Sequence, residues 1–179
     1  MRPLTSRDLS EFLGLVAASA ELHHPWMSLP TTPQEFQAYL ERYERSDSGE
    51  ESLLICVHDT GAIVGLANIS NIVRGRFQNG SLSYAAFAPT AGQGYMSEGL
   101  ALVLRHAFQQ LRLHRLEANI QPGNHASLKL VQRLGFRREG YSPDMLFIDG
   151  AWRDHERWAI TSSMIDIAAP DPHPTLPAR

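Results

Sequence analysis

The sequence contains a single cysteine, Cys56, and no apolar run long enough to span a bilayer. One cysteine excludes both an internal disulfide and a zinc site made of several thiolates. The N-terminus has no signal-peptide hydrophobic stretch after Met1, so we expect a reducing, cytoplasmic location and no membrane association. Cys56 lies within an apolar run, and we interpret it as a small buried residue rather than a nucleophile.

The chain also lacks a large excess of charge of either sign. Lys and Arg total 16 against 19 Asp and Glu, a formal net charge of −3. Domains that bind nucleic acid carry clustered positive charge, so we expect no nucleic-acid partner. Two adjacent histidines, His23 and His24, have no further ligands at metal-binding spacing, and we expect no metal.

The length of 179 residues fits one domain with a hydrophobic core. There is no internal repeat. The stretch from Ala168 to Arg179 holds four prolines and little that could be buried. We therefore expect a single domain over residues 1–163 and a proline-rich tail over 164–179.

The hydrophobic pattern predicts helices first and strands afterwards. Helices are expected over about 7–19, 33–44, 97–113 and 124–134, and strands over 52–57, 62–72, 81–87 and 115–121. Asp149-Gly150 predicts a closing hairpin. A right-handed crossover through the 97–113 helix makes the two strands around it parallel neighbours in a largely antiparallel sheet, which is a mixed α/β fold.

The segment Ala91–Glu98 lies between a strand and the clearest helix of the chain, which is strongly amphipathic. Gly92 and Gly94 allow a tight turn and a close approach to a ligand. The unpaired N–H groups and the dipole of the helix N-terminus suit a pyrophosphate. From these residues alone, a strand-to-helix turn with glycines needed only for geometry is an equally good interpretation.

This segment resembles the acetyl-CoA-binding motif of the GNAT N-acetyltransferase superfamily, and within it the RimJ/RimL-like branch. The similarity extends from about Arg2 to Thr161. Its sharper parts are Gly92–Glu98, Leu113–Ala118, Asn124–Ser127, Leu134–Gly140 and Asp149–His155, in order. Two residues depart from the family pattern: Ala91 replaces a frequent Gln or Arg, and Met96 replaces a small residue. The short stretch before Leu4 also leaves room only for a very short first strand.

The resemblance implies the GNAT fold, an α/β fold with a mixed, mostly antiparallel sheet flanked by helices and splayed between strands 4 and 5. The pantetheine arm of acetyl-CoA, the co-substrate, lies in that opening. Backbone groups of Phe87 and Ala88 are expected to pair with its amides, and an N–H there could polarise the thioester carbonyl. The implied cofactor-binding residues are Phe87, Ala88, Gly92, Gln93, Gly94, Tyr95, Met96, Ser97, Asn124 and Ser127.

Glu117 is the candidate catalytic base. It lies on the polar side of an alternating strand just after the 97–113 helix, where a carboxylate could accept the amine proton directly or through water. The resemblance supports this role, because relatives carry a glutamate at this position. The alternative is a structural ion pair with Arg115, Arg137 or Arg138.

Ser127 is the candidate partner of the leaving thiolate, since a hydroxyl can donate to sulfur. The resemblance assigns CoA contacts and the acid to Asn124 and Ser127. Other GNAT enzymes use a tyrosine seven positions after the asparagine, which is excluded here by Val131. For Asn124 the alternative is an ordinary helix N-cap, and both roles are compatible.

The acceptor wall is expected around His24 and Trp26, with Tyr84 as a further lining residue. Trp152 is expected to pack beneath the closing hairpin, and Asp154 to pair with Arg153 or Arg157.

The expected function is acetyl-CoA-dependent transfer of acetyl to a primary amine by direct attack in a ternary complex, with a protein or peptide N-terminal α-amine as the acceptor. The alternatives are a small-molecule amine acceptor, such as a polyamine, amino acid or antibiotic, or a non-catalytic CoA-binding domain. The partners are then acetyl-CoA and the amine, with the protein as a monomer or homodimer.

Overall fold

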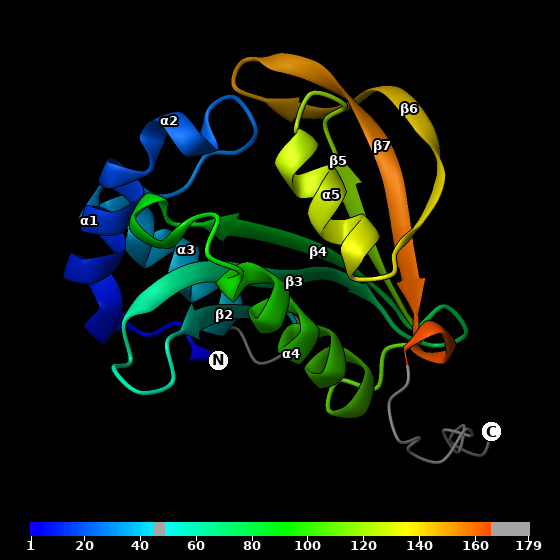
Figure 1. Ribbon diagram of the computed structural model, residues 1–179, viewed down its shortest axis with the longest axis horizontal. Coiled ribbons are helices and arrows are strands. Elements are labelled where there is room, and N and C mark those ends of the chain that lie inside the picture. The colour runs from blue at the N-terminus through cyan, green and yellow to red at the C-terminus, as the bar shows by residue number, and fades with distance from the viewer. Residues whose placement is uncertain (45–48, 166–179) are drawn as a thin grey trace.

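The computed structural model describes residues 1–44 and 49–165 (Figure 1). Its strands are β1 (Arg2–Pro3), β2 (Glu51–Cys56), β3 (Ile63–Val73), β4 (Asn79–Ala86), β5 (Arg115–Ile120), β6 (Arg137–Ile148) and β7 (Ala151–Thr161). Its α-helices are α1 (Leu9–Ala18), α2 (Ala20–His23), α3 (Pro33–Glu44), α4 (Tyr95–Gln109) and α5 (His125–Arg133). Short 3₁₀ turns cover Ser6–Asp8, Ala88–Thr90 and Ser162–Met164.

The strands form a single sheet in the order β1-β2-β3-β4-β5-β7-β6. All neighbours are antiparallel except β4 and β5, which are parallel. These two strands pair only where Asn79–Ser81 lies beside Arg115–Glu117. Beyond that point they diverge, so the expected splay between the fourth and fifth strands is confirmed.

Helices cover both faces of the sheet (Figure 1). On one face α4 and α5 bury a core with the strands, and α1 and α3 pack on the other face. The alternating pattern of β5 divides its side chains between these faces. Its apolar residues join the core under α4 and α5: Leu116, Ala118 and Ile120. Glu117 and Asn119 therefore project from the opposite face.

The closing hairpin is confirmed, with Asp149 (φ 52°) and Gly150 (φ 74°) both left-handed, as a type I′ turn requires. The expectation that Trp152 packs beneath it is wrong. The Trp152 side chain is 61% exposed and stacks edge-on against Phe147, at 5.6 Å between ring centroids. The turn contacts the rest of the chain through Asp149, whose Oδ2 lies 3.2 Å from His24 Nε2, and not through Trp152.

Three boundaries differ from the sequence prediction. The first helical region divides at Ser19 (φ −113°, ψ 10°), whose hydroxyl donates to the Leu15 carbonyl, and α2 follows beyond the expected end of the first helix. Helix α4 begins at Tyr95 and ends at Gln109, because Gly94 caps it and Arg112 adopts a left-handed φ of 53°. Most of the predicted tail, from residue 166, lies outside the described residues.

Within the described residues, no helix is long and apolar enough to cross a membrane. The same residues contain no group of three or more His, Cys, Asp or Glu side chains suited to hold a metal ion.

Candidate functional site

The turn between β4 and α4 presents unpaired backbone donors. Gly92 (φ 79°) and Gly94 (φ 91°) both adopt left-handed conformations, which alanine would strain. Within the described residues, the N–H groups of residues 92–96 donate no hydrogen bond. A Cβ added at either glycine would meet no heavy atom within 4 Å. The turn is thus an open cluster of donors at the positive end of a helix dipole, suited to bind an anion.

Met96 and Ser97, in the first turn of α4, point to different surroundings. The Met96 side chain packs on β3, where a Cβ at Gly65 would lie 2.2 Å from its sulfur. The family's small residue is therefore replaced without a side chain entering the turn. The Ser97 hydroxyl accepts a hydrogen bond from Arg133 of α5 at 3.0 Å, which brings a cation to the edge of the donor cluster.

Ser127 in the first turn of α5 contacts β4 across the splay. The Tyr84 hydroxyl lies 2.6 Å from Ser127 Oγ. Burial raises the pKa of Tyr84 to about 12, so its phenol is protonated at neutral pH. Asn124 is the N-cap of α5, and its Oδ1 accepts from the Ser127 N–H at 3.1 Å. The cap thereby fixes the backbone position of Ser127.

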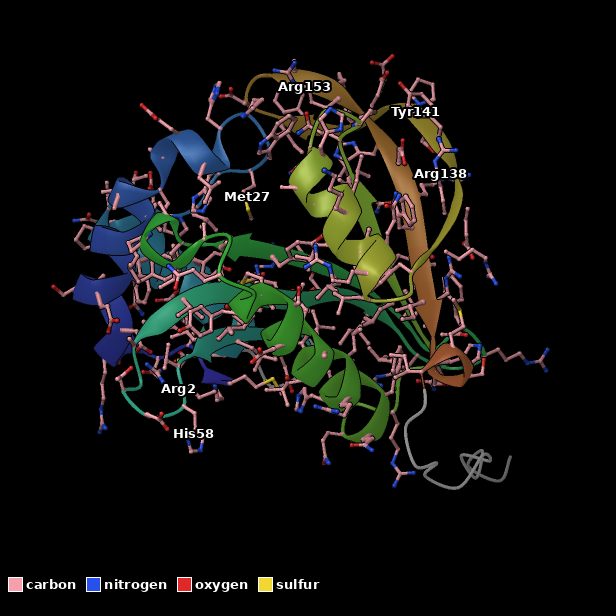
Figure 2. The ribbon with its side chains drawn as sticks, in the orientation of Figure 1. Arg2, Met27, His58, Arg138, Tyr141 and Arg153 are labelled. Atoms are coloured by element: carbon pink, nitrogen blue, oxygen red, sulfur yellow. The ribbon has the colours of Figure 1, made fainter. Side chains whose placement is uncertain are left out.

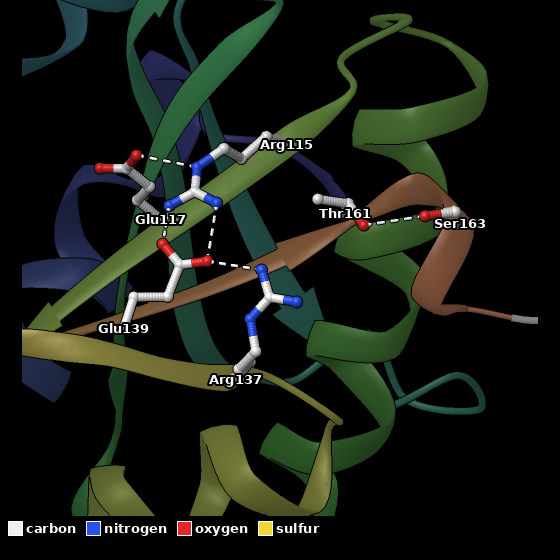
Figure 3. A network of polar contacts seen from close by, with 6 residues as sticks. All are labelled: Arg115, Glu117, Arg137, Glu139, Thr161 and Ser163. Atoms are coloured by element: carbon white, nitrogen blue, oxygen red, sulfur yellow. Dashed lines mark hydrogen bonds and ion pairs between the residues drawn. The ribbon is translucent and has the colours of Figure 1, made fainter.

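Glu117 lies near the point where the two strands part, on the face opposite α5. Of the three arginines considered as its partner, Arg115 is the one that binds it, with Nε 2.9 Å from Oε1 (Figure 3). Arg115 also binds Glu139, which in turn binds Arg137 at 2.7 Å (Figure 3). The second Glu117 oxygen has no partner among the described residues. The arginine thus orients the carboxylate while leaving one oxygen available.

Hydrogen bonds from Arg115 and then Arg137 lower the pKa of Glu139 to about 2. The Glu139 hydrogen bond is also the main cause that raises the pKa of Arg115. Arg115 is therefore a permanent cation held from two sides.

Phe87 and Ala88 do not offer the free N–H groups that the sequence led us to expect. The Phe87 N–H donates to the Val64 carbonyl at 3.0 Å, and the Ala88 N–H donates to Ser19 Oγ at 2.9 Å. Neither group is available as an oxyanion donor in this structure. Beyond Ser81, the β5-facing edge of β4 remains without a strand partner.

The loop between α2 and α3 bridges the wide end of the splay (Figure 1). His24 Nε2 lies 3.2 Å from Asp149 Oδ2 at the turn of the β6–β7 hairpin. Gln121 donates to the Pro25 and Trp26 carbonyls at 3.3 and 3.4 Å. In Figure 2, Met27 points from this loop into the space between α2 and the sheet. His24 and Trp26 thus lie together on this bridge, whereas Tyr84 lies apart from them, against Ser127.

Asp154 does not pair with Arg153 or Arg157 as expected. Its carboxylate accepts from the Tyr141 hydroxyl and, at 2.9 Å, from the Asp144 N–H. A register shift between Ser142 and Leu146 brings Asp144 into reach, and a strand pattern gives no signal for such a bulge.

Two contacts of the site were missed by sequence reasoning. Tyr84 was expected on the acceptor wall, but it lies on the same face of β4 as Leu82, toward α5. The sequence pattern also gives no signal for the contact of Arg133. Arg133 lies at the end of α5 and reaches Ser97 in the first turn of α4. This contact depends on how α5 packs beside α4, which no local sequence pattern encodes.

Comparison with known proteins places this geometry in a family. Residues 1–137 match the family described as acetyltransferase (GNAT) domain. The ribosomal protein uS5-alanine N-acetyltransferase of Escherichia coli (strain K12) is 43% identical over 104 residues, which cover 58% of this chain and 54% of that protein. The chain thus spans about half the length of that curated relative.

Two further relatives match over more of their length. The probable N-acetyltransferase YjcK of Bacillus subtilis (strain 168) is 28% identical over 168 residues, covering 89% of this chain and 92% of that protein. The structure of Mycobacterium smegmatis RimJ in complex with CoA-disulfide superposes with a TM-score of 0.85 at 27% identity, covering 93% of this chain and 83% of that one. GNAT acetyltransferases use acetyl-CoA. The chain belongs to the GNAT acetyltransferase family and has the GNAT fold.

Proposed function

We propose that this protein is a cytoplasmic, acetyl-CoA-dependent N-acetyltransferase that acts on the α-amine of a protein or peptide N-terminus. The observation that carries the proposal is the arrangement around the splay. A cluster of unpaired N–H donors lies at the start of α4, the Tyr84–Ser127 pair lies on the α5 side, and Glu117 lies on the other side.

Acetyl-CoA, when bound, supplies an already activated acyl group, so positioning the two reactants provides much of the rate. The N–H groups of residues 92–96 would hold the pyrophosphate, and Arg133 at Ser97 adds a cation beside them. The unpaired edge of β4 would hold the pantetheine arm as an added strand.

Glu117 would take the proton that the attacking ammonium must lose. Its free oxygen is the acceptor, directly or through one water, while Arg115 holds the other oxygen. The loss of this proton leaves the amine with the lone pair that forms the new C–N bond.

Ser127 would stabilise the departing thiolate by a hydrogen bond. A protonated Tyr84 that donates to Ser127 Oγ leaves the serine hydrogen free to point at sulfur. Asn124 keeps this hydroxyl in place by binding the Ser127 N–H. Deprotonation of the amine and stabilisation of the thiolate are thus assigned to opposite faces of the sheet at the splay.

The α-amine acceptor is favoured by the E. coli relative, whose name specifies N-acetylation of an alanine of ribosomal protein uS5. A small-molecule amine remains the alternative acceptor. Thiol release measured over peptides with free N-termini, polyamines and aminoglycosides distinguishes them, with the acetylated product located by mass spectrometry. Release with peptides and none with the other amines is expected; release only with small amines would contradict the acceptor assignment.

Two variants test the assigned roles. Ser127→Ala should lower turnover about 10- to 100-fold, the equivalent of a charge-assisted hydrogen bond, with acetyl-CoA affinity unchanged. Ser163→Ala is the matched control, because Ser163 also shares a hydroxyl hydrogen bond, with Thr161 at 3.0 Å, away from the splay (Figure 3). Unchanged turnover in Ser127→Ala would remove Ser127 from the mechanism.

Glu117→Gln should lower activity by a factor that shrinks as pH rises, because more of the amine is then already neutral. Glu139→Gln is its control: both variants replace a carboxylate that is ion-paired with Arg115 by a neutral amide, and only Glu117 is assigned the proton. A loss in Glu117→Gln that is uniform across pH would make Glu117 structural.

A further inference from the structure

Two polar side chains, Asn119 and His155, share the sheet face that Glu117 occupies. Asn119 follows Glu117 by two residues on β5, and it pairs in register with Arg157 on β7. His155 precedes Arg157 by two residues, so it lies on that same face, diagonal to Asn119. Neither residue has a role in the chemistry described above.

The α2–α3 loop covers this part of the face. Gln121 follows Asn119 by two residues. Its side chain donates to the Pro25 and Trp26 carbonyls. A Cβ at Gly123 would lie 3.1 Å from the Trp26 ring. His155 is only 2% exposed. Its ring is therefore shielded from bulk water, whereas the Glu117 side chain, on the same face, is 30% exposed.

His155 presents a hydrogen-bond acceptor into this region. Its Nδ1 lies 2.9 Å from the Arg153 carbonyl, which can only accept, so Nδ1 carries the hydrogen. Burial lowers the pKa of His155, which favours the neutral ring at pH 7. Nε2 is then the lone-pair nitrogen, and it has no partner within the described ranges.

Asn119 presents a second acceptor. Its Oδ1 is buried and has no hydrogen-bond donor among the residues described. A buried acceptor without a donor is unfavourable, and native proteins usually supply one from the chain, from water or from a ligand. Two unused acceptors on one face, with Asn119 two residues from the Glu117 carboxylate, suit a ligand that is rich in N–H donors.

We propose that Asn119 Oδ1 and His155 Nε2 bind two N–H groups of the acceptor's primary amine, while Glu117 takes the third proton through intervening water. This inference rests on the proposed acetyltransferase function. A primary ammonium has three hydrogens: two are held by these acceptors, one passes to the Glu117 carboxylate, and the freed electron pair attacks the thioester carbon. An N-methylated amine has one N–H fewer and is discriminated against by this arrangement.

Two substitutions at His155 distinguish a role of its Nε2 in binding the amine from a role in folding. His155→Asn keeps a donor for the Arg153 carbonyl and deletes the Nε2 acceptor, whereas His155→Gln keeps a polar atom near the Nε2 position. We expect His155→Asn to raise KM for an alanyl peptide about tenfold, which corresponds to ~1.4 kcal/mol, and His155→Gln to raise it less. The preference for an alanyl over an N-methylalanyl peptide should fall by a similar factor in His155→Asn.

Asn119→Leu provides an independent arm. It removes the unpaired Oδ1 at similar volume, so thermal stability should be equal to or above that of the wild type, while KM for the alanyl peptide rises. Lower stability with unchanged KM would make Asn119 a structural residue. Because His155→Asn could fail to fold, Asn119→Leu alone then decides the test.

The outcomes separate this inference from the proposed function. If the wild-type protein acetylates no amine, both the proposed function and this inference are wrong. A wild type that acetylates peptides, with variants that keep its KM and its discrimination against the N-methylated peptide, overturns only the assignment of Asn119 and His155. Acetyl-CoA affinity, measured by calorimetry, should be the same in the wild type and in both the His155→Asn and Asn119→Leu variants.

Discussion

Replacing Gly94 with alanine distinguishes a phosphate-binding turn from a turn whose glycines serve geometry alone. Gly94 has φ 91° and ψ −18°, and a Cβ there would meet no protein atom within 4 Å. The left-handed conformation costs an L-residue about 1–2 kcal/mol. Gly94→Ala should therefore lower the free energy of unfolding by that amount, a shift in Tm of about 2–4 °C per kcal/mol for a domain of this size.

Gly61→Ala is the matched control. Gly61 is also left-handed, at φ 73°, with open space around its Cβ position, and it lies in the β2–β3 turn. The same steric argument gives it the same loss of stability. Only at Gly94 does the added methyl group enter the space in front of the unpaired N–H groups of residues 92–96.

Calorimetric titration of both variants with CoA provides the decisive comparison. We expect Gly94→Ala to weaken CoA binding at least about tenfold, ~1.4 kcal/mol, and Gly61→Ala to leave it unchanged. If the two variants lose equal stability and both bind CoA like the wild type, the turn holds no phosphate and the reasoning about its donors is refuted.

Further predictions concern the core, the charge network and the α5 cap. Phe12→Ala removes a fully buried ring packed on Phe36 and Phe87 and should cost about 3–5 kcal/mol in urea unfolding; a cost below 1 kcal/mol would contradict this packing. Because the pKa of Glu139 is lower in the folded than in the unfolded state, its ion pairs stabilise the fold above pH 4.5. This stabilisation is lost as the pH falls through the folded pKa of about 2. Glu139→Gln should thus be less stable than the wild type at pH 7, and the difference should close between pH 4.5 and 2; a difference constant over that range would contradict it. Asn124→Ala should lose about 1 kcal/mol and reduce turnover, whereas Asn124→Ser, which keeps an N-cap, should retain most of both.

Local patterns were sufficient to predict most of the elements and the order of the sheet's central part. The helix at Pro33, the β6–β7 turn at Asp149-Gly150 and the parallel β4–β5 pair all follow from residue types and spacing that act over a few positions. The break at Ser19 does not, because a serine in a helical context signals a break only when its hydroxyl finds a backbone carbonyl.

The candidate site was predicted in part, since its residues come from separate elements. The glycine turn and the Asn124 cap are local signals and appear where expected. The contact between Tyr84 and Ser127 joins residues 43 positions apart, and it depends on how α5 docks on the splayed sheet. The occupied N–H groups of Phe87 and Ala88 likewise depend on Val64 and Ser19, which lie far away in the sequence.

The α-amine acetyltransferase activity is tested most directly by mass spectrometry of a lysine-free peptide incubated with the protein and acetyl-CoA. We predict one acetyl group on the peptide α-nitrogen, formed in equal amount to the released CoA thiol and reduced in Ser127→Ala. Binding of acetyl-CoA without acetylation of that peptide, or equal acetylation of a lysine-containing peptide whose α-amine is blocked, would contradict it.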